Sequence, residues 1–289
     1  MPVTATAAHG KQSDNHRKPF LGVSVLTPFS AFLEPISAVP KQSIQLTADW
    51  AQGRATYGGL VAALMLQGMQ SHVDAERLLR SVQVTFVAPA APQEAQLCVE
   101  TLRVGGSVTL MSARLVQAGL VCATATASFG APRVSTIHIP GVPRPEVVAP
   151  EQLRPTPYIP GVVPTFLQHF DMRWASGNLP LSGAKEPDFS GWLKFRELAA
   201  RWSDVWMIGL LDAWPAGVLP MLSKPAPASS LSWAVDLVTP GEAVPPDGWW
   251  FYEVQTQGAA DGYTQADARL WLPDGRLAAV SRQTSAVFG

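Results

Sequence analysis

One carboxylate of this sequence lies in a setting that suggests chemistry. Asp212 stands in the segment WMIGLLDAWP, where its near neighbours are apolar. Burying an unpaired carboxylate costs several kcal/mol, so such a residue needs polar partners or a function. Pro215 cannot donate the amide that a helix would use, so a helix here should kink or end beside Asp212. A solvent-facing aspartate is the alternative, but isolated acids in apolar segments tend to mark functional sites.

A second candidate feature is the pair Gly58-Gly59 at the start of the segment GGLVAALMLQGM. Glycine allows another chain or a ligand to approach the backbone closely. The first amides of a helix have no partner within it and carry positive partial charge, which suits a developing oxyanion. Tight packing of the helix start explains the pair equally well. Ser230 and Gln283, considered alone, are ordinary polar residues of strand-like segments.

The composition excludes several other kinds of site. The formal net charge is −1, so no overall basic field would hold nucleic acid or an anionic membrane. Cys98 and Cys122 are too few for a disulfide framework. The histidines are scattered without the spacing of a zinc site, so we expect neither a metal nor a cofactor. No signal peptide is recognisable and the longest apolar stretch is too short to span a membrane, so we expect a cytoplasmic protein.

A proline-rich segment separates two related halves. Between residues 132 and 164 the chain has nine of its 26 prolines, which excludes a helix or a central strand there. The sequence around Val84 matches that around Val235 at an offset of 151 (235 − 84). Further on, the sequence around Ala113 matches that around Ala268 at 155 (268 − 113). Matches that keep their order predict a fused duplication.

Each half is predicted to contain a helix followed by antiparallel strands. Between residues 58 and 69 only Gln67 is strongly polar, so this helix has no face for water and must be enclosed. In the second half Ser203 can cap a helix that runs through Asp212 to Trp214. Strand patterns are expected at 43–51, 81–89, 95–104, 107–117 and 120–129, and again at 229–238, 249–257, 262–272 and 276–288.

A curled antiparallel sheet around one buried helix is the hotdog fold. We therefore predict an α+β double hotdog, in which two such units follow one another along the chain. Its expected parts are a flexible N-terminal tail (1–38), an N-terminal hotdog (39–131), a Pro-rich linker (132–165) and a C-terminal hotdog (166–289).

Three segments of the first half together resemble a known family. They are YGGLVAALMLQGM, LLRSVQVTFVAPA and VETLRVGGSVTLMSARLVQAGLVCATATASFGAP. Their order and spacing are similar to those of the acyl-CoA thioesterase II (TesB-like) family of double-hotdog proteins. The second half resembles the family more loosely, from HFDMRW to the C-terminus.

The resemblance implies both a site and a reaction. In the family an Asp on the second helix, a Thr or Ser on the following strand and a Gln near the C-terminus together hold the attacking water. Asp212, Ser230 and Gln283 fall at these positions. The implied reaction is hydrolysis of an acyl-CoA to free acid and CoA, with Asp212 as the base. A backbone amide of Gly58 or Gly59 is the expected oxyanion donor.

The chain departs from the family pattern at three places. The GGQ that begins the family's first helix is here Gly58-Gly59-Leu60, and serine stands at position 230 where threonine is commoner. The VQEG-like ending is replaced by Arg282-Gln283-Thr284-Ser285. These changes leave the predicted fold intact and bear on the choice of substrate and on activity.

Two other functions remain alternatives. A non-catalytic acyl-CoA-binding or assembly protein could keep the fold without turnover. Hotdog hydratases and dehydratases use a catalytic His near the central helix, but neither predicted helix core contains one, and His72 lies at the end of the first. Nine of the ten tryptophans lie from Trp174 onward, which packing explains most simply and an aromatic-lined acyl pocket explains alternatively.

The halves have diverged enough to predict a single site per chain. The second helix has Asp212 and the last strand has Gln283, whereas the first half has only small or apolar residues around Ala62 and Ala127. We therefore expect one acyl-CoA site per chain, between the halves, with no nucleic acid or membrane partner. Candidates for contact with CoA phosphates are Arg54, Arg80, Arg173 and Arg201, although solvated surface arginines are the simpler interpretation. The sequence leaves a homo-oligomer, such as a dimer, open.

Overall fold

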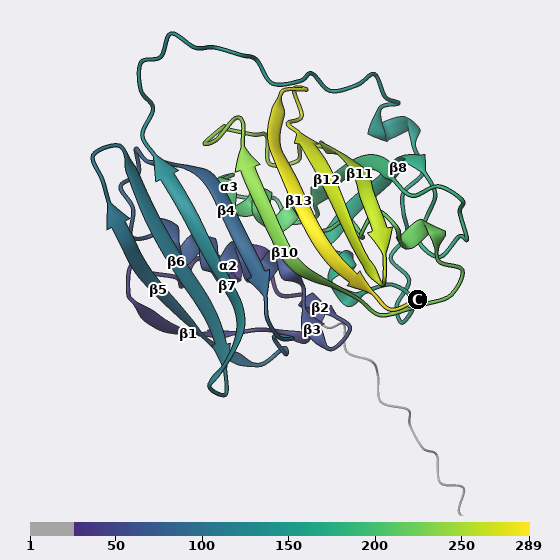
Figure 1. The fold of residues 1–289 in the computed structure, drawn as a ribbon, viewed down its shortest axis with the longest axis horizontal. Coiled ribbons are helices and arrows are strands. Elements are labelled where there is room, and N and C mark those ends of the chain that lie inside the picture. Colours follow the sequence, from purple (N-terminus) through teal and green to yellow (C-terminus); the bar gives the residue numbers. More distant parts are fainter. Residues whose placement is uncertain (1–25) are drawn as a thin grey trace, which may run out of the picture.

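Eleven antiparallel strands form one continuous sheet that curves around two helices (Figure 1). The computed structural model describes residues 26–289. The strands of the first half are β1 (Lys41–Gln45), β4 (Leu78–Phe86), β5 (Glu94–Val104), β6 (Val108–Gln117) and β7 (Leu120–Gly130). Those of the second half are β8 (Phe170–Gly177), β9 (Phe189–Phe195), β10 (Ala228–Leu237), β11 (Trp250–Ala260), β12 (Tyr263–Trp271) and β13 (Leu277–Val287). Their order in the sheet is β1-β5-β6-β7-β4-β10-β13-β12-β11-β9-β8.

The order of the strands confirms the predicted double hotdog. Reading outward from the centre, β4-β7-β6-β5-β1 in the first half corresponds to β10-β13-β12-β11-β9 in the second. The two halves join where β4 pairs with β10, with Val84 opposite Trp233 and Val82 opposite Val235. The sequence patterns did not identify β8 and β9. Strand β9 takes the position that β1 has in the first half, and β8 is an additional strand at the edge.

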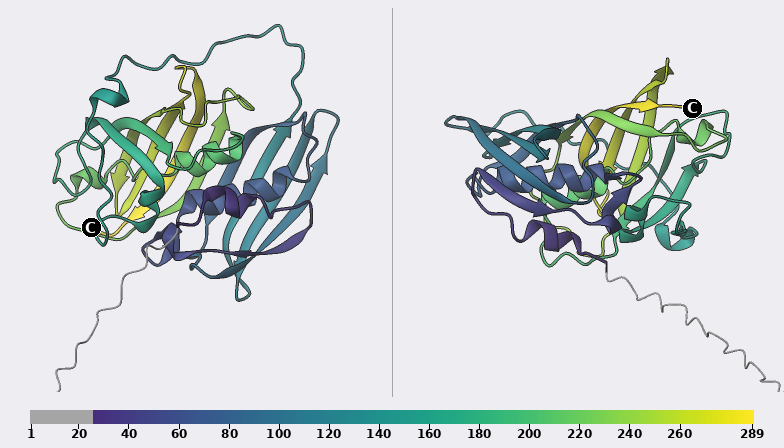
Figure 2. Two further views of the ribbon diagram at one scale, coloured as in Figure 1. Left: turned by 180° about the vertical axis from the view of Figure 1, so that it is seen from behind. Right: turned by 90° about the horizontal axis from the view of Figure 1, so that it is seen from below.

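The first helix is buried on all sides, as its composition requires. Helix α2 (Gly58–Gln70) has ten of its 13 residues buried and contacts β4, β5, β6 and β7. Its boundaries agree with the predicted helix over 58–69. The short helix α1 (Phe29–Leu33) covers part of its remaining surface. Figure 2 shows α2 and α3 lying next to each other against the concave side of the sheet.

The second helix is shorter than the sequence predicted. Helix α3 (Asp204–Leu211) ends one residue before Asp212, which is its C-terminal cap. Pro215 follows soon after, and its lack of an amide proton explains why the helix stops. Asp212 is therefore at the end of the helix and not within it. Ser203 does precede the helix, but its side chain makes no capping hydrogen bond.

Part of the expected N-terminal tail is folded, which corrects the predicted boundary at residue 38. Phe29 is fully buried, and its ring lies 4.8 Å from Phe195 and 4.9 Å from Trp206. Gly209 provides the space, because a Cβ there would lie 2.3 Å from the Phe29 ring. Residues 1–25, the rest of the expected tail, lie outside the described residues.

The proline-rich linker forms no strand and crosses the outside of the second half (Figure 1). Two tryptophans hold it there: Trp271 Nε1 donates to Val142 O, and Trp192 Nε1 donates to Val148 O, both at 2.9 Å. Short 3-10 turns complete the structure at Ala48–Trp50, Pro150–Gln152, Thr165–His169 and Leu219–Met221, with a two-stranded hairpin of β2 (Ala51–Gln52) and β3 (Ala55–Thr56). No described helix has the length and apolar character needed to cross a membrane.

The junction between the halves generates a stability prediction. Val82 is fully buried on the inner face of β4, whereas its neighbour Gln83 is exposed on the outer face. We expect Val82→Asp to lower the free energy of unfolding by about 4 kcal/mol or more, because it buries an unpaired charge. Gln83→Asp, the matched control, should change it by less than about 0.5 kcal/mol. Thermal and denaturant unfolding measure both, and equal effects would contradict the assigned faces of β4.

Candidate active site

A cleft between the two halves contains the predicted site residues. Its volume is about 380 Å³, and Gly58, Asp212, Ser230 and Gln283 all line it. The other lining segments are the β2–β3 hairpin, the end of β4, the start of β7 and the loop after α3. The structure thus brings together residues that are separated by up to 225 positions (283 − 58) in the sequence.

The side-chain amide of Gln283 connects the other two polar groups. Its Nε2 donates to Asp212 Oδ1 at 3.0 Å and to Ser230 Oγ at 3.0 Å. Both hydrogens of the amide nitrogen are used in this way, which fixes the orientation of the Gln283 side chain. Asp212, Gln283 and Ser230 therefore form one connected polar group inside an apolar surrounding.

A bulge in β10 decides which residue joins this group. Trp233 pairs with Gln283 and Ser230 pairs with Ser285, with one extra residue, Leu231, between the two pairs. In a regular strand the alternation from buried Trp233 would turn Leu231 inward and Ser230 outward. The extra residue reverses this alternation, so Ser230 faces the cleft.

The same bulge occurs in the first half, but there it serves only packing. Between β4 and β7 the register shifts between Leu79 and Ser81, and Arg80 is the extra residue. Leu79 therefore takes the place that Ser230 has in the second half, and it is 1% exposed. Ala127 corresponds to Gln283, because Ala127 pairs with Val82 in the first half and Gln283 pairs with Trp233 in the second. At these two positions the first half has an apolar pair where the second has a hydroxyl and an amide.

Asp212 faces the start of α2 across the boundary between the halves. The Gly59 amide donates to its carboxylate. A Cβ added to Gly58 would lie 2.7 Å from Asp212 Oδ2, so only glycine leaves room for the carboxylate there. A Cβ on Gly59 would lie 2.4 Å from the Tyr57 hydroxyl oxygen. Both glycines are thus required by packing, and the positive end of the α2 dipole points toward Asp212.

Burial raises the pKa of Asp212 from its ordinary value of 3.8 to about 7, against the hydrogen bonds from Gln283 and Gly59, which lower it. Removing the carboxylate from water disfavours its charged form, whereas donors to its oxygens favour that form. The balance leaves a carboxyl group that exchanges a proton near neutral pH. This is the property that a general base needs in order to take and return a proton.

Tyr57 was not identified as a site residue from the sequence. Its hydroxyl donates to Gly209 O at 3.0 Å, a carbonyl near the end of α3. Tyr57 is fully buried, and burial together with the nearby Asp212 charge raises its pKa well above the ordinary value, so it remains a neutral donor. The bond fastens the start of α2 to the end of α3. The feature of the sequence that could have identified Tyr57 is its position directly before Gly58-Gly59.

No described histidine lines the cleft. His72 contacts the Gly68 carbonyl at the far end of α2, at 2.9 Å, and His169 stacks on Trp50 with ring centroids 3.9 Å apart. Within residues 26–289 no group of three or more His, Cys, Asp and Glu is arranged to hold a metal ion.

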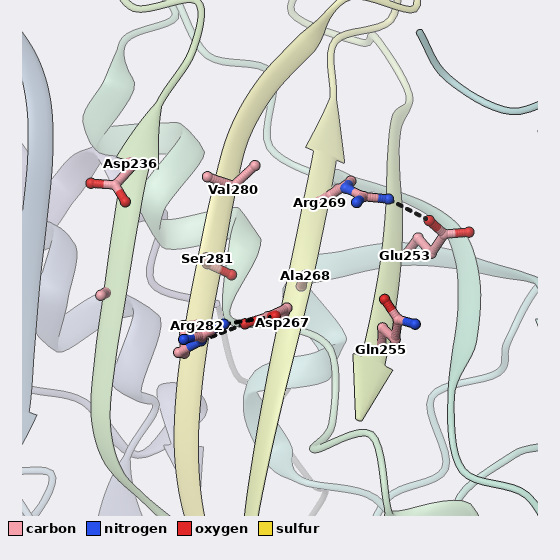
Figure 3. A pocket seen from close by; sticks show the side chains of 10 residues that line it. Asp236, Glu253, Gln255, Asp267, Ala268, Arg269, Val280, Ser281 and Arg282 are labelled. Carbon is pink, nitrogen blue, oxygen red and sulfur yellow. Dashed lines mark hydrogen bonds and ion pairs between the residues drawn. The ribbon is translucent and has the colours of Figure 1, made fainter. Parts of the chain in front are cut away.

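A second groove, of about 430 Å³, lies on the outer face of β10 to β13 (Figure 3). Four of its five charged residues form two ion pairs: Arg282 Nε donates to Asp267 Oδ1 at 2.6 Å, and Arg269 lies 3.8 Å from Glu253. Arg282 precedes Gln283 in β13, so the two side chains point to opposite faces of the sheet. This groove is therefore separate from the cleft.

Comparisons with known proteins identify the family. A family model of the acyl-CoA thioesterase N-terminal domain matches residues 46–130, and one of the acyl-CoA thioesterase C-terminal domain matches residues 150–287. A comparison with curated protein sequences finds no match.

Several solved structures share the fold. A putative thioesterase II from Thermobifida fusca is 20% identical, with a TM-score of 0.78 over 91% of this chain and 98% of that one. A hot dog protein of unknown function from Alicyclobacillus acidocaldarius is 21% identical, with a TM-score of 0.76 over 86% and 94%. The acyl-CoA thioesterase II TesB2 from Mycobacterium marinum is 19% identical, with a TM-score of 0.70 over 86% and 94%.

The two family models together cover most of the chain and divide it as the fold does. The central strands β4 and β10 fall in different domains of the family, and the cleft lies between those domains. The chain belongs to the acyl-CoA thioesterase family of TesB-like double-hotdog proteins.

Proposed function

We propose that this protein hydrolyses acyl-CoA thioesters at the cleft between its two halves. The observation that supports this most directly is the hydrogen-bonded group of Asp212, Gln283 and Ser230. It combines a carboxyl group whose pKa is about 7 with an amide and a hydroxyl that can orient a water molecule. The family assignment supports the same class of substrate.

In the proposed reaction Asp212 takes a proton from water as the water oxygen attacks the thioester carbonyl carbon. Gln283 and Ser230 hold that water in position. The resulting tetrahedral intermediate breaks its carbon–sulfur bond, and the proton on Asp212 passes to the departing sulfur of CoA. The products are a carboxylic acid and CoA, and Asp212 returns to its initial state.

Gly58 is the proposed oxyanion donor. The Gly59 amide donates to the Asp212 carboxylate, so its role in this proposal is to position the base. The Gly58 amide belongs to the first turn of α2, where helices leave N–H groups without an internal partner. Gly58 also lines the cleft. One such donor is typically worth about 10²–10³ in rate.

The position of Arg54 suggests how CoA enters. Arg54 is exposed between β2 and β3, and it is the one basic residue among the described residues that line the cleft. The phosphates of CoA would be attracted to this rim, which leaves the thioester nearer to Asp212. We propose one such site per chain, because the corresponding positions of the first half are Leu79 and Ala127.

The first test is a panel of acyl-CoAs with a thiol reagent that detects released CoA. We expect release from at least one of them, and Asp212→Asn should lower kcat about 10²–10⁴-fold because the base is lost. Asp204→Asn is the matched control, since Asp204 begins the same helix and instead accepts a hydrogen bond from the Gly241 amide. Wild-type turnover in Asp212→Asn would exclude Asp212 as the base. Acyl-CoA binding without any turnover would favour a non-catalytic acyl-CoA-binding protein.

Asp212→Asn should also stabilise the protein above neutral pH. The folded state holds the Asp212 proton more tightly than the unfolded state, because the pKa falls from about 7 to 3.8 on unfolding. The charged carboxylate therefore lowers the free energy of unfolding as pH rises from about 4 to 7, by at most about 4 kcal/mol. We expect a higher Tm for Asp212→Asn than for wild type at pH 8 and similar values at pH 4. A lower Tm at pH 8 would contradict the cost assigned to burial.

The pH dependence of turnover tests the pKa of Asp212 through its proposed catalytic role. The base must be deprotonated, so kcat/KM should rise with pH and level off above about 7. The Gln283 hydrogen bond lowers the pKa of Asp212, so Gln283→Ala should move the rise to higher pH as well as reduce the rate. A pH–rate profile of both proteins measures the shift. A shift to lower pH would show that another group is titrating.

Gly58→Ala tests the contact between α2 and Asp212. The added methyl group would lie 2.7 Å from Asp212 Oδ2, so the carboxylate must move, and we expect kcat to fall about tenfold or more. Gly68→Ala is the matched control, because it adds the same group to the same helix against Leu97, away from the cleft. Comparable kcat values for Gly58→Ala and wild type, in folded protein, would contradict the proposed role of this contact.

A further inference from the structure

Two cavities of very different size meet at Asp212 and Gln283. One is the cleft of about 380 Å³, and the other is an internal cavity of about 20 Å³. Trp214 and Ala216 line both cavities together with Asp212 and Gln283. A cavity of the smaller size has room for one water molecule and for no alkyl chain.

Aromatic side chains fill the space next to the small cavity. The Trp214 ring stacks on Tyr252 at 5.4 Å with an interplanar angle of 10°, and its edge meets Trp174 at 4.8 Å. The Phe189 ring packs against a third side of the Trp214 ring, with the ring centroids 5.6 Å apart. Gly191 provides the space for the ring, because a Cβ there would lie 2.3 Å from Trp214 Cη2. The interior of the second hotdog is therefore occupied just beyond Asp212.

Packing alone holds the Trp214 ring in place. Trp214 is 5% exposed, and its indole N–H has no hydrogen-bond partner among the described residues. A buried donor without a partner is unfavourable, so hydrogen bonding does not explain a tryptophan here. What the ring does provide is bulk at the inner end of the cleft. Substitution of this residue therefore changes volume without breaking a hydrogen bond.

The direction of the substrate follows from the charges of the cleft, and this step rests on the proposed function. CoA phosphates near the Arg54 rim leave the thioester at Asp212, so the acyl group is directed to the inner end where Trp214 lies. An acyl group that continues past the carbonyl carbon in this direction meets the Trp214 ring.

We propose that Trp214 is a specificity-determining residue that limits the acyl group to the size of acetyl or propionyl. The sheltered space between helix and sheet is the place where a longer chain would be buried, and in the second hotdog Trp214, Tyr252 and Trp174 occupy it. A chain that does not fit must remain in the open cleft, where it buries less apolar surface and binds less tightly.

Non-hydrolysable S-alkyl-CoA thioethers test this proposal without requiring turnover. Calorimetric titration of the wild-type protein with S-ethyl-CoA and S-octyl-CoA should give an affinity at least about tenfold higher for the ethyl compound. In Trp214→Leu the preference should move toward S-octyl-CoA by about tenfold or more, because the removed ring leaves a cavity. Trp214→Phe removes less volume and replaces Trp214→Leu if that variant does not fold.

Trp206→Leu is the matched control. Trp206 lies within α3, eight residues before Trp214, and is also 5% exposed, but it packs against Phe29 and Phe195 and lines neither cavity. It should keep the wild-type preference. Equal wild-type affinity for both thioethers, or an unchanged preference in a folded Trp214 variant, would overturn the proposal, as would an equal shift in Trp206→Leu.

The same titrations separate this proposal from the proposed function. Failure of every thioether and of free CoA to bind would contradict acyl-CoA as the ligand, and the limit on the acyl group would fall with it. The expected length preference without hydrolysis of any acyl-CoA would contradict catalysis while supporting the role of Trp214. Hydrolysis of acyl-CoAs with no preference for short chains would support the proposed function and contradict the size limit assigned to Trp214.

Discussion

The hydrogen bond between the Gln283 amide and the buried Asp212 carboxylate is the interaction on which the rest of the site depends. Asp212 is at the end of α3, and Gln283 is in the last strand. The start of α2 supplies a second donor through the Gly59 amide. A carboxylate without these donors would remain protonated at neutral pH, because burial alone disfavours its charge. Docking of the first half brings the Gly59 amide to Asp212 and so opposes the rise in pKa that burial causes.

This arrangement lowers stability at the place where chemistry is proposed. A charged Asp212 opposes folding at neutral pH, and the indole N–H of Trp214 lies buried beside it without a partner among the described residues. The surrounding structure compensates through apolar packing, since α2 is enclosed and a large set of aromatic rings fills the second half. Polar groups that are unfavourable in a core persist where the scaffold is stable enough to hold them.

The duplication explains how two similar halves come to differ at the proposed site. Both halves have a bulge in their central strand, and in each half it turns one residue from the outer to the inner face. In the first half that residue is Leu79, which adds to the core. In the second half it is Ser230, which joins Gln283. Both halves share the bulge. The side chain that it turns inward packs into the core in the first half and joins the proposed site in the second.

Much of the fold followed from local sequence patterns. The apolar segment from Gly58 onward requires enclosure, alternating residues predict most of the strands, and the prolines of residues 132–164 exclude regular structure. Strands β8 and β9 were not recognised. In β9 only Lys194 departs from burial, so the alternation that identifies a half-exposed strand is missing there. The folded segment from Phe29 was also missed, because its burial depends on Gly209, which is remote in the sequence.

Residue types along the chain were enough to identify Asp212 as a carboxylate in an apolar segment, and the family resemblance added Ser230 and Gln283 as its companions. How the three side chains meet depends on contacts between distant segments. The bulge at Leu231 depends on the pairing of β10 with β13, the end of α3 at Leu211 places Asp212 at a cap, and the closure by Trp214 depends on the missing side chain of Gly191. Each of these is a relation between segments distant in the chain. Residue type and spacing predict local structure, whereas register, helix docking and cavity size depend on contacts that local patterns do not contain.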